Sequence, residues 1–183
     1  MSKTDLSKFN NSWYNPGASW LIRAMWYCTN ASFFNSYFPF YSIKIFLLRL
    51  YGAKVGHGVV IKPKLNIKYP WNVRIGNNAW VGENVWIDSL GKIYIGADSC
   101  ISQGAMLITG NHNYKKSSFD LMVGDIILEE GVWIGTGAIV CAGVACKSHS
   151  VLTAGSVATD DLEAYSIYQG NPAVKIKERI LAE

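Results

Sequence analysis

Aliphatic residues recur every six positions along most of the chain, beginning at Val55. An α-helix would bring apolar residues round every three or four positions, and a half-buried strand every two. A period of six instead predicts one short strand followed by a turn, with three such units completing a triangular coil. Four separate runs keep the spacing: Val55, Ile61 and Ile67; Ile75, Val81 and Ile87; Ile95, Ile101 and Leu107; and Leu128, Ile134, Val140, Cys146 and Leu152.

Small residues reinforce this period. Glycine often follows the aliphatic residue directly, as at Gly56, Gly76 and Gly135, and a small residue often stands four positions after it, as at Ala79 and Ala105. Glycine suits a sharp turn, and stacked coils bury a continuous aliphatic column. A β-sandwich would instead show alternating strands about every 8–12 residues. We therefore predict a mainly β fold, a parallel β-helix of hexapeptide repeats.

The period is interrupted in places. It slips by two residues before Ile75 and again before Ile95, and it fails altogether over 109–125. That last interval is too long and too polar for a turn, and long loops in compact domains are usually functional. We expect 109–125 to protrude from the β-helix.

The chain divides into three segments on this basis. An N-terminal helical segment is expected over 1–51, the β-helix over 52–160, and a C-terminal tail over 161–183. Within the tail, the Lys-rich residues 174–182 are expected to form a short helix that caps the open end of the solenoid.

The N-terminal segment predicts two helices over 19–51, broken near Pro39. Residues 24–43 carry no charge and are long enough to span a bilayer, but their serines and asparagines make a spanning helix a poor fit. This aromatic-rich stretch suits peripheral contact with a membrane surface. It is equally well suited to packing on the β-helix or across an oligomer, and the sequence does not distinguish these three roles.

Composition narrows the class of protein. Half of the 183 residues are hydrophobic and 16% are charged, which indicates a packed globular chain. The net charge of +4 suits an anionic ligand, but without a clustered basic face we expect no nucleic-acid binding. The first ten residues lack the apolar core of a signal peptide. With four cysteines, this favours a cytoplasmic protein with free thiols.

Several motifs resemble the bacterial hexapeptide-repeat O-acetyltransferases, which include the galactoside, maltose and nodulation-factor enzymes. The likeness covers about residues 40–180, and two of the motifs resemble the colanic-acid-biosynthesis type in particular. The family motifs are Thr-Gly-Asn-His-Asn at 109–113, Gly-Val-Trp-Ile-Gly at 131–135 and Gly-Asn-Pro-Ala at 170–173; those of the colanic-acid type are Phe-Leu-Leu-Arg-Leu-Tyr-Gly-Ala-Lys-Val-Gly at 46–56 and Tyr-Pro-Trp at 69–71.

The resemblance implies properties that composition and spacing do not show. It implies a left-handed coil and a homotrimer with acetyl-CoA lying in the cleft between adjacent prisms. It also implies transfer of an acetyl group to a hydroxyl of a sugar or an exopolysaccharide precursor, with no metal required. A lipid-linked sugar acceptor would place the protein at the inner membrane face.

His112 is the expected catalytic base. A sugar hydroxyl is a weak nucleophile at neutral pH, and an imidazole with a pKa near 6.5 can accept its proton during attack on a thioester. His112 stands in the interrupting loop, at the position that matches the catalytic histidine of the family. The other two histidines, His57 and His149, are expected on the surface.

Two further polar residues are candidates for the catalytic site. Asn84 lies eleven residues before Ile95, where the galactoside-type enzymes carry an acceptor-binding asparagine. Asp88 occupies a slot usually filled by a small residue, and its carboxylate could orient His112 or hold a sugar hydroxyl. Either residue could instead simply stabilise a turn.

The cofactor-binding candidates follow from the same resemblance. Trp133 matches a residue that covers the cleft, although it could also be a packed outward aromatic. Basic residues after the Gly-Asn-Pro-Ala turn reach the CoA phosphates in the family. Here Lys175, Lys177 or Arg179 could do so, or could lie on a solvated face. The family places the pantetheine arm near Gly135 and Thr136 and against the backbone of Ala154 and Gly155.

These residues predict direct transfer in a ternary complex. Cys146 falls on the inward aliphatic column, so we expect no cysteine nucleophile. Two alternatives stay open. A metal-dependent, carbonic-anhydrase-like activity would need three converging histidines, and the three here are scattered. A non-catalytic scaffold or binding protein would not require His112, the interrupting loop and the basic tail together.

Overall fold

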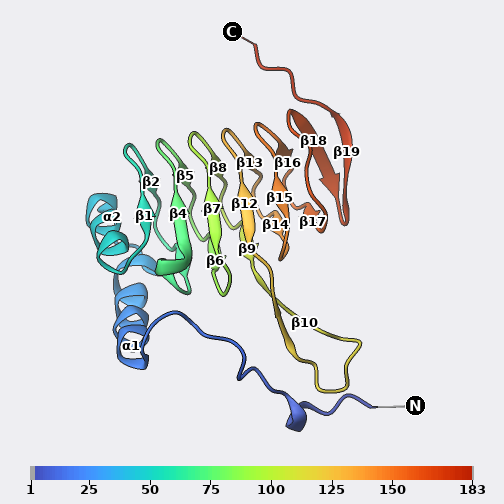
Figure 1. The fold of residues 1–183 in the computed structure, drawn as a ribbon. Coiled ribbons are helices and arrows are strands. Elements are labelled where there is room, and N and C mark those ends of the chain that lie inside the picture. The colour runs from blue at the N-terminus through green and yellow to red at the C-terminus, as the bar shows by residue number, and fades with distance from the viewer. Residues whose placement is uncertain (1–2, 183) are drawn as a thin grey trace.

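The protein is a triangular β-solenoid with helices at its N-terminal end and two hairpins (Figure 1). The computed structural model describes residues 3–182. Met1, Ser2 and Glu183, the outermost residues of the predicted segments 1–51 and 161–183, lie outside the described residues.

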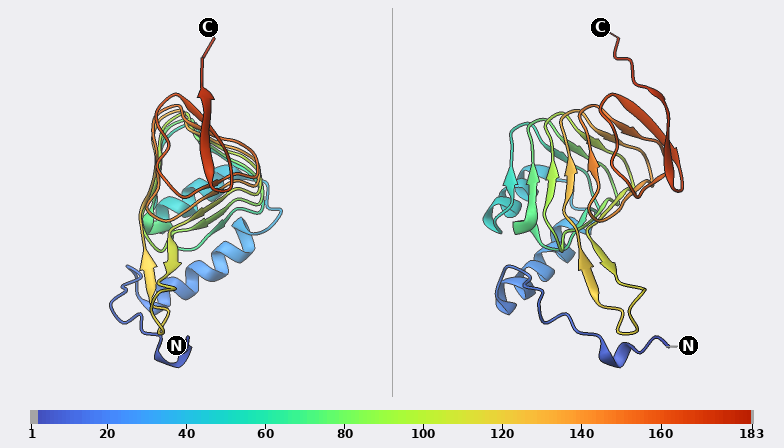
Figure 2. Two further views of the ribbon diagram at one scale, coloured as in Figure 1. Left: turned by 90° about the vertical axis from the view of Figure 1, so that its right-hand side faces the viewer. Right: turned by 45° about the vertical axis from the view of Figure 1, so that its right-hand side comes forward.

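Short parallel strands stack into the three faces of the prism. The view along the axis shows the triangular outline (Figure 2). The first face holds β1 (Lys54–Val55), β4 (Val73–Ile75), β7 (Ile93–Ile95), β12 (Ile126–Leu128) and β15 (Ala145–Cys146). The second holds β2 (Val60–Ile61), β5 (Trp80–Val81), β8 (Cys100–Ile101), β13 (Trp133–Ile134), β16 (Val151–Leu152), β18 (Ser166–Gly170) and β19 (Ala173–Glu178). The third holds β3 (Asn66–Ile67), β6 (Trp86–Asp88), β9 (Met106–Ile108), β14 (Ile139–Val140) and β17 (Val157–Ala158).

The aliphatic residues of the six-residue period fill the interior. All of them are buried except Val55 in the first coil, which is half-buried. The small residues four positions later are buried as well, so each side of a coil sends two side chains inward. This packing confirms the predicted parallel β-helix of hexapeptide repeats. Removing aliphatic surface from water at every coil is the main stabilising term.

Two of the three corners are tight and regular. The corner between the second and third faces has Asn84, Gly104, Gly137 and Gly155 in the left-handed backbone region, with φ of 56°, 68°, 65° and 69°. Each of their N–H groups donates a hydrogen bond to the coil before it. Glycine and asparagine adopt this conformation at little cost, which explains their recurrence at this corner.

The third corner, between the third and first faces, is the variable one. Before β4 and β7 it contains extra residues, including the 3-10 turn η3 (Pro70–Asn72), and these produce the two slips of the period. After β9 it opens into the hairpin of β10 (Gly110–His112) and β11 (Leu121–Val123), with Gly110 paired to Val123. The interval 109–125, where the period fails, therefore extends from the prism, as Figure 1 shows.

Helices cover the N-terminal end of the prism. They are α1 (Trp20–Thr29), which continues into the π-helical turn η2 (Asn30–Phe34), and α2 (Tyr41–Leu50). The Ser19 hydroxyl caps α1, and the break between the helices contains Pro39, so the two predicted helices are confirmed. A short 3-10 turn, η1 (Leu6–Lys8), precedes them. Within residues 3–182, no helix is long and apolar enough to cross a membrane.

The predicted C-terminal helix over 174–182 is wrong. Residues 173–178 form β19, which pairs antiparallel with β18. Apolar Val174 and Ile176 alternate with Lys175 and Lys177, which is the period of a strand. The hairpin also supplies hydrogen bonds to β18, whose edge a helix would leave unpaired.

Candidate active site

The base of the protruding hairpin is fixed by a buried threonine. Thr109 donates its hydroxyl to the backbone carbonyl of Asp88 and accepts the N–H of Gly91 at 2.9 Å. Gly110 follows it in a tight space, because a Cβ there would lie 2.6 Å from Leu90 Cδ1 and 3.2 Å from Asp88 Oδ2. The Thr-Gly pair of the 109–113 motif therefore sets the direction in which the hairpin leaves the prism.

The hairpin holds His112 by its ring. The Nδ1 atom lies 3.0 Å from the backbone oxygen of Phe119, and the Phe119 ring stacks on the imidazole with centroids 4.5 Å apart and planes 8° apart. A carbonyl oxygen only accepts hydrogen bonds, so Nδ1 carries the proton in the neutral ring. This leaves Nε2 with a free lone pair, which is the state a general base requires.

His112 lines a cavity of about 490 Å³ that the N-terminal segment closes on one side. Phe9 lies 5.8 Å from the imidazole between ring centroids, and Tyr14 donates its hydroxyl to the Leu90 carbonyl at 2.9 Å. Burial raises the pKa of Tyr14 well above its usual value, with smaller contributions from Tyr69 and Asp88, so this phenol stays neutral. The lining residues are Phe9, Asn11, Ser12, Tyr14, Pro16, Arg23, Lys68, Tyr69, Leu90, His112 and Leu121.

Asp88 lies behind this cavity at the end of β6. Its carboxylate is buried, and Oδ1 is 3.1 Å from Lys68 Nζ. The contact is an ion pair without hydrogen-bond geometry, since Oδ1 accepts no hydrogen bond from residues 3–182. The structure therefore brings Asp88 close to the start of β10 beside Gly110, but no described hydrogen bond joins it to His112.

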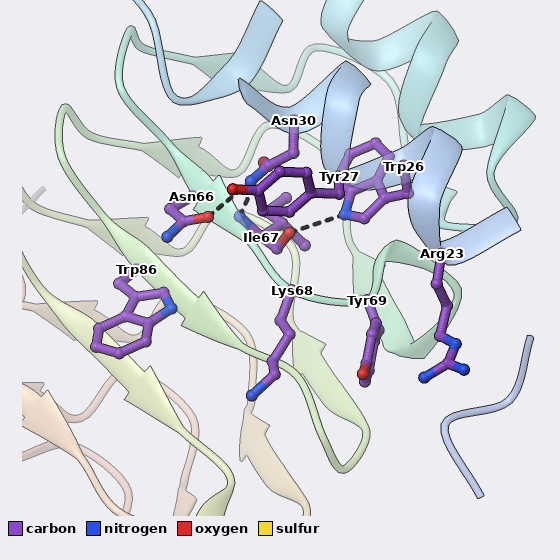
Figure 3. Close-up of a pocket in the computed structure, with 9 residues that line it drawn as sticks. All are labelled: Arg23, Trp26, Tyr27, Asn30, Asn66, Ile67, Lys68, Tyr69 and Trp86. Atoms are coloured by element: carbon purple, nitrogen blue, oxygen red, sulfur yellow. Dashed lines mark hydrogen bonds between the residues drawn. The ribbon is translucent and has the colours of Figure 1, made fainter. Parts of the chain in front are cut away.

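A second cavity of about 390 Å³ adjoins the first (Figure 3). The two share Arg23, Lys68 and Tyr69. Half of its remaining lining residues are aromatic, so it is called the aromatic cavity below, and a hydrogen bond fixes one of them: Trp26 Nε1 donates to the Ile67 carbonyl at 2.9 Å. The remaining lining residues are Trp26, Tyr27, Asn30, Asn66, Ile67 and Trp86.

The other candidates lie along the second face and its corner with the third. The Trp133 ring is half exposed, and its Nε1 donates to Ser102 Oγ at 2.9 Å. Gly135 sits directly under the next coil, because a Cβ there would come within 2.5 Å of Ala154 N. The Thr136 hydroxyl donates to Gln103 Oε1 at 3.4 Å.

The corner glycines on this side leave an open edge. A Cβ on Gly104, Gly137 or Gly155 would meet nothing within 4 Å. Asn84 occupies the same corner two coils before Gly137, and it lines a small cavity with Tyr37 and Lys64 instead of facing His112. Within one protomer, Asn84 therefore belongs to this edge, while His112 and Asp88 belong to the hairpin corner.

The two lysines of the C-terminal hairpin, Lys175 and Lys177, differ in whether they form ion pairs. Lys175 Nζ lies 2.7 Å from both Glu163 Oε2 and Glu178 Oε1, and the hydrogen bonds that it donates to these carboxylates raise the pKa of the lysine. Lys177 stands opposite Ile167 on β18, with no ion pair to any residue between 3 and 182. Of the two, Lys177 is the one free to meet a phosphate.

Sequence reasoning did not identify several residues around His112. Tyr14 and Arg23 come from the N-terminal segment, far from the repeats, and no period marks them. Tyr69 lies in the Tyr-Pro-Trp motif at 69–71, which was noted only as a resemblance, and Lys68 precedes it. Across residues 3–182, no group of three His, Cys, Asp or Glu side chains converges so that it could hold a metal ion.

The fold is that of the hexapeptide-repeat β-solenoids, and comparison with known proteins shows the family. The chain is 38% identical to a provisionally named colanic acid biosynthesis acetyltransferase, WcaF, of Escherichia coli strain K12, over 98% of this chain and 99% of that protein. The chain belongs to the hexapeptide-repeat acetyltransferases of this colanic-acid-biosynthesis type. No protein-family model matches it.

Solved structures that share the fold include two acetyltransferases. One is a maltose O-acetyltransferase of Clostridium difficile 630, with a TM-score of 0.79 and 23% identity over 89% of this chain and 90% of that one. The other is a hexapeptide-repeat acetyltransferase of Vibrio cholerae in complex with acetyl-CoA, with a TM-score of 0.79 and 22% identity over 88% and 91%.

Proposed function

We propose that the protein transfers the acetyl group of acetyl-CoA to a hydroxyl of a sugar or exopolysaccharide precursor, with His112 as the general base. The observation that carries this proposal is the hydrogen bond from His112 Nδ1 to the Phe119 carbonyl, which leaves Nε2 unprotonated beside a cavity of about 490 Å³. That volume suits a sugar.

The chain's own groups would act as follows. His112 Nε2 would accept the proton of the sugar hydroxyl as the oxygen attacks the acetyl carbonyl, and the Phe119 carbonyl would stabilise the imidazolium that results. The carbon–sulfur bond then breaks, and the CoA thiol leaves with the proton returned by His112 Nε2. A direct transfer in a ternary complex suits Cys100, Cys141 and Cys146, because burial raises the pKa of each thiol, that of Cys146 to about 12.

The second face and its corner fit the co-substrate. An extended pantetheine arm needs backbone it can approach, and the corner around Gly155 offers space with no side chain in front of it. Trp133 would cover the arm, Thr136 and Ala154 would lie beside it, and Lys177 would meet the phosphates. Acetyl-CoA supplies the activated acetyl group. The acetyl-CoA complex of the Vibrio cholerae protein supports this assignment.

A homotrimer would unite the two halves of the site. His112 and the Gly155 edge lie at different corners of one prism, so one protomer does not bring them together. In a trimer with parallel axes, the hairpin of one copy would face the glycine corner of the next. Each active site would then consist of residues from two copies.

The N-terminal segment suits peripheral contact with the inner face of a membrane. Trp20, Leu21, Met25, Phe46 and Leu50 are all exposed on α1 and α2. Between Leu6 and Gly82 the chain has nine Lys and Arg residues and no Asp or Glu. Exposed aromatic side chains surrounded by basic residues favour binding to anionic bilayers. Sedimentation with phosphatidylglycerol vesicles, but not with phosphatidylcholine vesicles, is the expected result; equal binding to both would contradict it.

The test of the reaction is release of the CoA thiol from acetyl-CoA across a panel of sugars and sugar-lipid precursors. Wild type should release CoA with at least one acceptor, and His112→Ala should lose about a hundredfold or more of that rate, as expected for a general base. His57→Ala is the matched control, since His57 is exposed at a corner of the first coil. Full activity of His112→Ala would exclude it as the base.

A further inference from the structure

Arg23 is a cation without a counter-ion. It projects from α1, and no Asp or Glu lies within ion-pair distance of it in the described part of the chain. Its Nε is buried and donates to no acceptor among residues 3–182. A half-buried guanidinium left unpaired is costly, so such a group calls for a partner, and a bound anion is one that would satisfy its charge as well as its N–H groups.

An anion bound to Arg23 would lie between the two cavities of the candidate site. Arg23, Lys68 and Tyr69 form the boundary shared by the His112 cavity and the aromatic cavity. In Figure 3 the three side chains extend in the same direction, with Tyr69 between the two cations. Lys68 is already balanced by Asp88 at 3.1 Å, so the uncompensated charge at this boundary is that of Arg23.

The one carboxylate described beside these groups, Asp88, is paired with Lys68, and the phenols around Arg23 would not repel an anion. The Tyr14 hydroxyl is engaged with the Leu90 carbonyl at 2.9 Å and stays neutral. Tyr69 stacks on Trp71 with ring planes 17° apart and presents its phenol to both cavities. Arginine is the side chain best matched to phosphate, because its planar fork donates two parallel hydrogen bonds.

We propose that the acceptor is a sugar joined to a phosphate or diphosphate, with this anion held by Arg23 and assisted by Lys68. The inference rests on the proposed function. The sugar would occupy the His112 cavity, and the group beyond the phosphate would lie along the aromatic walls formed by Trp26, Tyr27 and Trp86. A lipid and a nucleoside both carry such a diphosphate, and both would suit an aromatic wall.

The first experiment measures anion binding without turnover. Inorganic pyrophosphate is titrated into the full-length protein by calorimetry, for wild type, Arg23→Gln, Arg23→Lys and Arg74→Gln. Wild type should bind saturably, and Arg23→Gln should weaken binding by about tenfold or more, as charge-assisted hydrogen bonds predict. Arg23→Lys should fall between them. Arg74, which packs over Tyr94 on the first face, is the matched control and should bind like wild type.

Three results of that titration would overturn the inference. They are absence of saturable binding, equal binding by Arg23→Gln and wild type, and displacement of pyrophosphate by CoA, which would assign the cation to the co-substrate. Circular dichroism and thermal unfolding of each variant establish that it is folded. If Arg23→Gln does not fold, Arg23→Lys carries the comparison.

The second experiment distinguishes a lipid diphosphate from a nucleoside diphosphate. It also distinguishes failure of the anion site from failure of the proposed acetyl transfer. Each sugar of the acceptor panel is offered free, as its 1-phosphate, as its nucleoside diphosphate and as its farnesyl diphosphate in micelles. At least one phosphorylated form should show a higher kcat/KM than the free sugar, and Arg23→Gln should abolish that advantage. Equal kcat/KM for all forms would overturn only the anion site. CoA release with none of them would overturn the proposed function, while the pyrophosphate titration would still report on Arg23.

Discussion

One residue of the candidate site adopts an unfavourable backbone conformation. Phe119 has φ of 52°, in the left-handed region that bulky residues rarely occupy. This conformation accompanies two contacts with His112: the Phe119 carbonyl accepts the Nδ1 proton, and the Phe119 ring stacks on the imidazole. Backbone strain of this kind commonly occurs where a catalytic group must be held in one orientation. A single residue thus fixes both the tautomer and the plane of the ring.

Lys44 provides a residue-scale prediction about stability. Its side chain is fully buried on α2, where Nζ donates to the Lys62 carbonyl at 3.3 Å, and burial lowers the pKa of this amine. The folded state therefore binds this proton less tightly than the unfolded chain. The resulting destabilisation is fully present below the lowered pKa of the folded state. It disappears as the pH rises from that pKa towards 10.5, the ordinary pKa of a lysine.

We expect Lys44→Met to raise the unfolding free energy at pH 7 by up to about 1 kcal/mol, since an apolar side chain often replaces a buried charge without loss. Between pH 7 and 10.5, stability should rise more steeply with pH in wild type than in the variant. Urea unfolding at several pH values measures both. Lys54→Met, at an exposed position on β1, should follow wild type, and a parallel pH dependence in all three proteins would contradict the prediction.

At the scale of elements, the hexapeptide strands were predictable because their determinants are local. Ile87 and Ile134 show their inward position through spacing alone, and both are buried. The C-terminal strand was mistaken for a helix, because residues beyond the repeat have only composition to indicate their structure. The cavity around His112 was not predictable, since Tyr14 and Arg23 reach it through tertiary packing that no periodicity encodes.

The strand β13 supports an element-scale prediction. Ile134 lies between β8 and β16 and is fully buried, whereas Ile127 on β12 points outward and is 43% exposed. Ile134→Ala should lower the unfolding free energy by about 2–5 kcal/mol, because a core cavity is left behind. Ile127→Ala should cost under about 1 kcal/mol. Chemical denaturation of the pair would contradict the solenoid core if both variants lost the same amount.

At the scale of the whole molecule, the two groups of candidate site residues occupy separate edges of the prism. The hairpin corner carries His112, and the glycine corner carries Gly155. If each active site needs one edge from each of two copies, then two inactive variants can complement one another. Nothing of the kind can occur if one copy holds a complete site.

We expect His112→Ala and Gly155→Arg to be inactive alone and to regain activity when co-expressed. The arginine would project into the open space at that corner and block it, at a backbone cost of roughly 1–2 kcal/mol for a left-handed residue. With random mixing, about a quarter of the interfaces would pair an intact hairpin with an intact corner, which sets the rough scale of recovery. Gly155→Asn, which tolerates this conformation, is the control and should stay active. Absence of recovery in mixed oligomers would place the complete site within one copy.

The hairpin also has a consequence for how this protein could be changed. Its two ends, Gly110 and Val123, are directly paired, and the coils before and after it continue in register through β9 and β14. The solenoid therefore does not depend on what lies between those ends. We therefore expect this segment to be exchangeable. Transplanting a hairpin from a relative that acts on another acceptor, joined at this pair, should alter acceptor selectivity while the solenoid keeps its melting temperature.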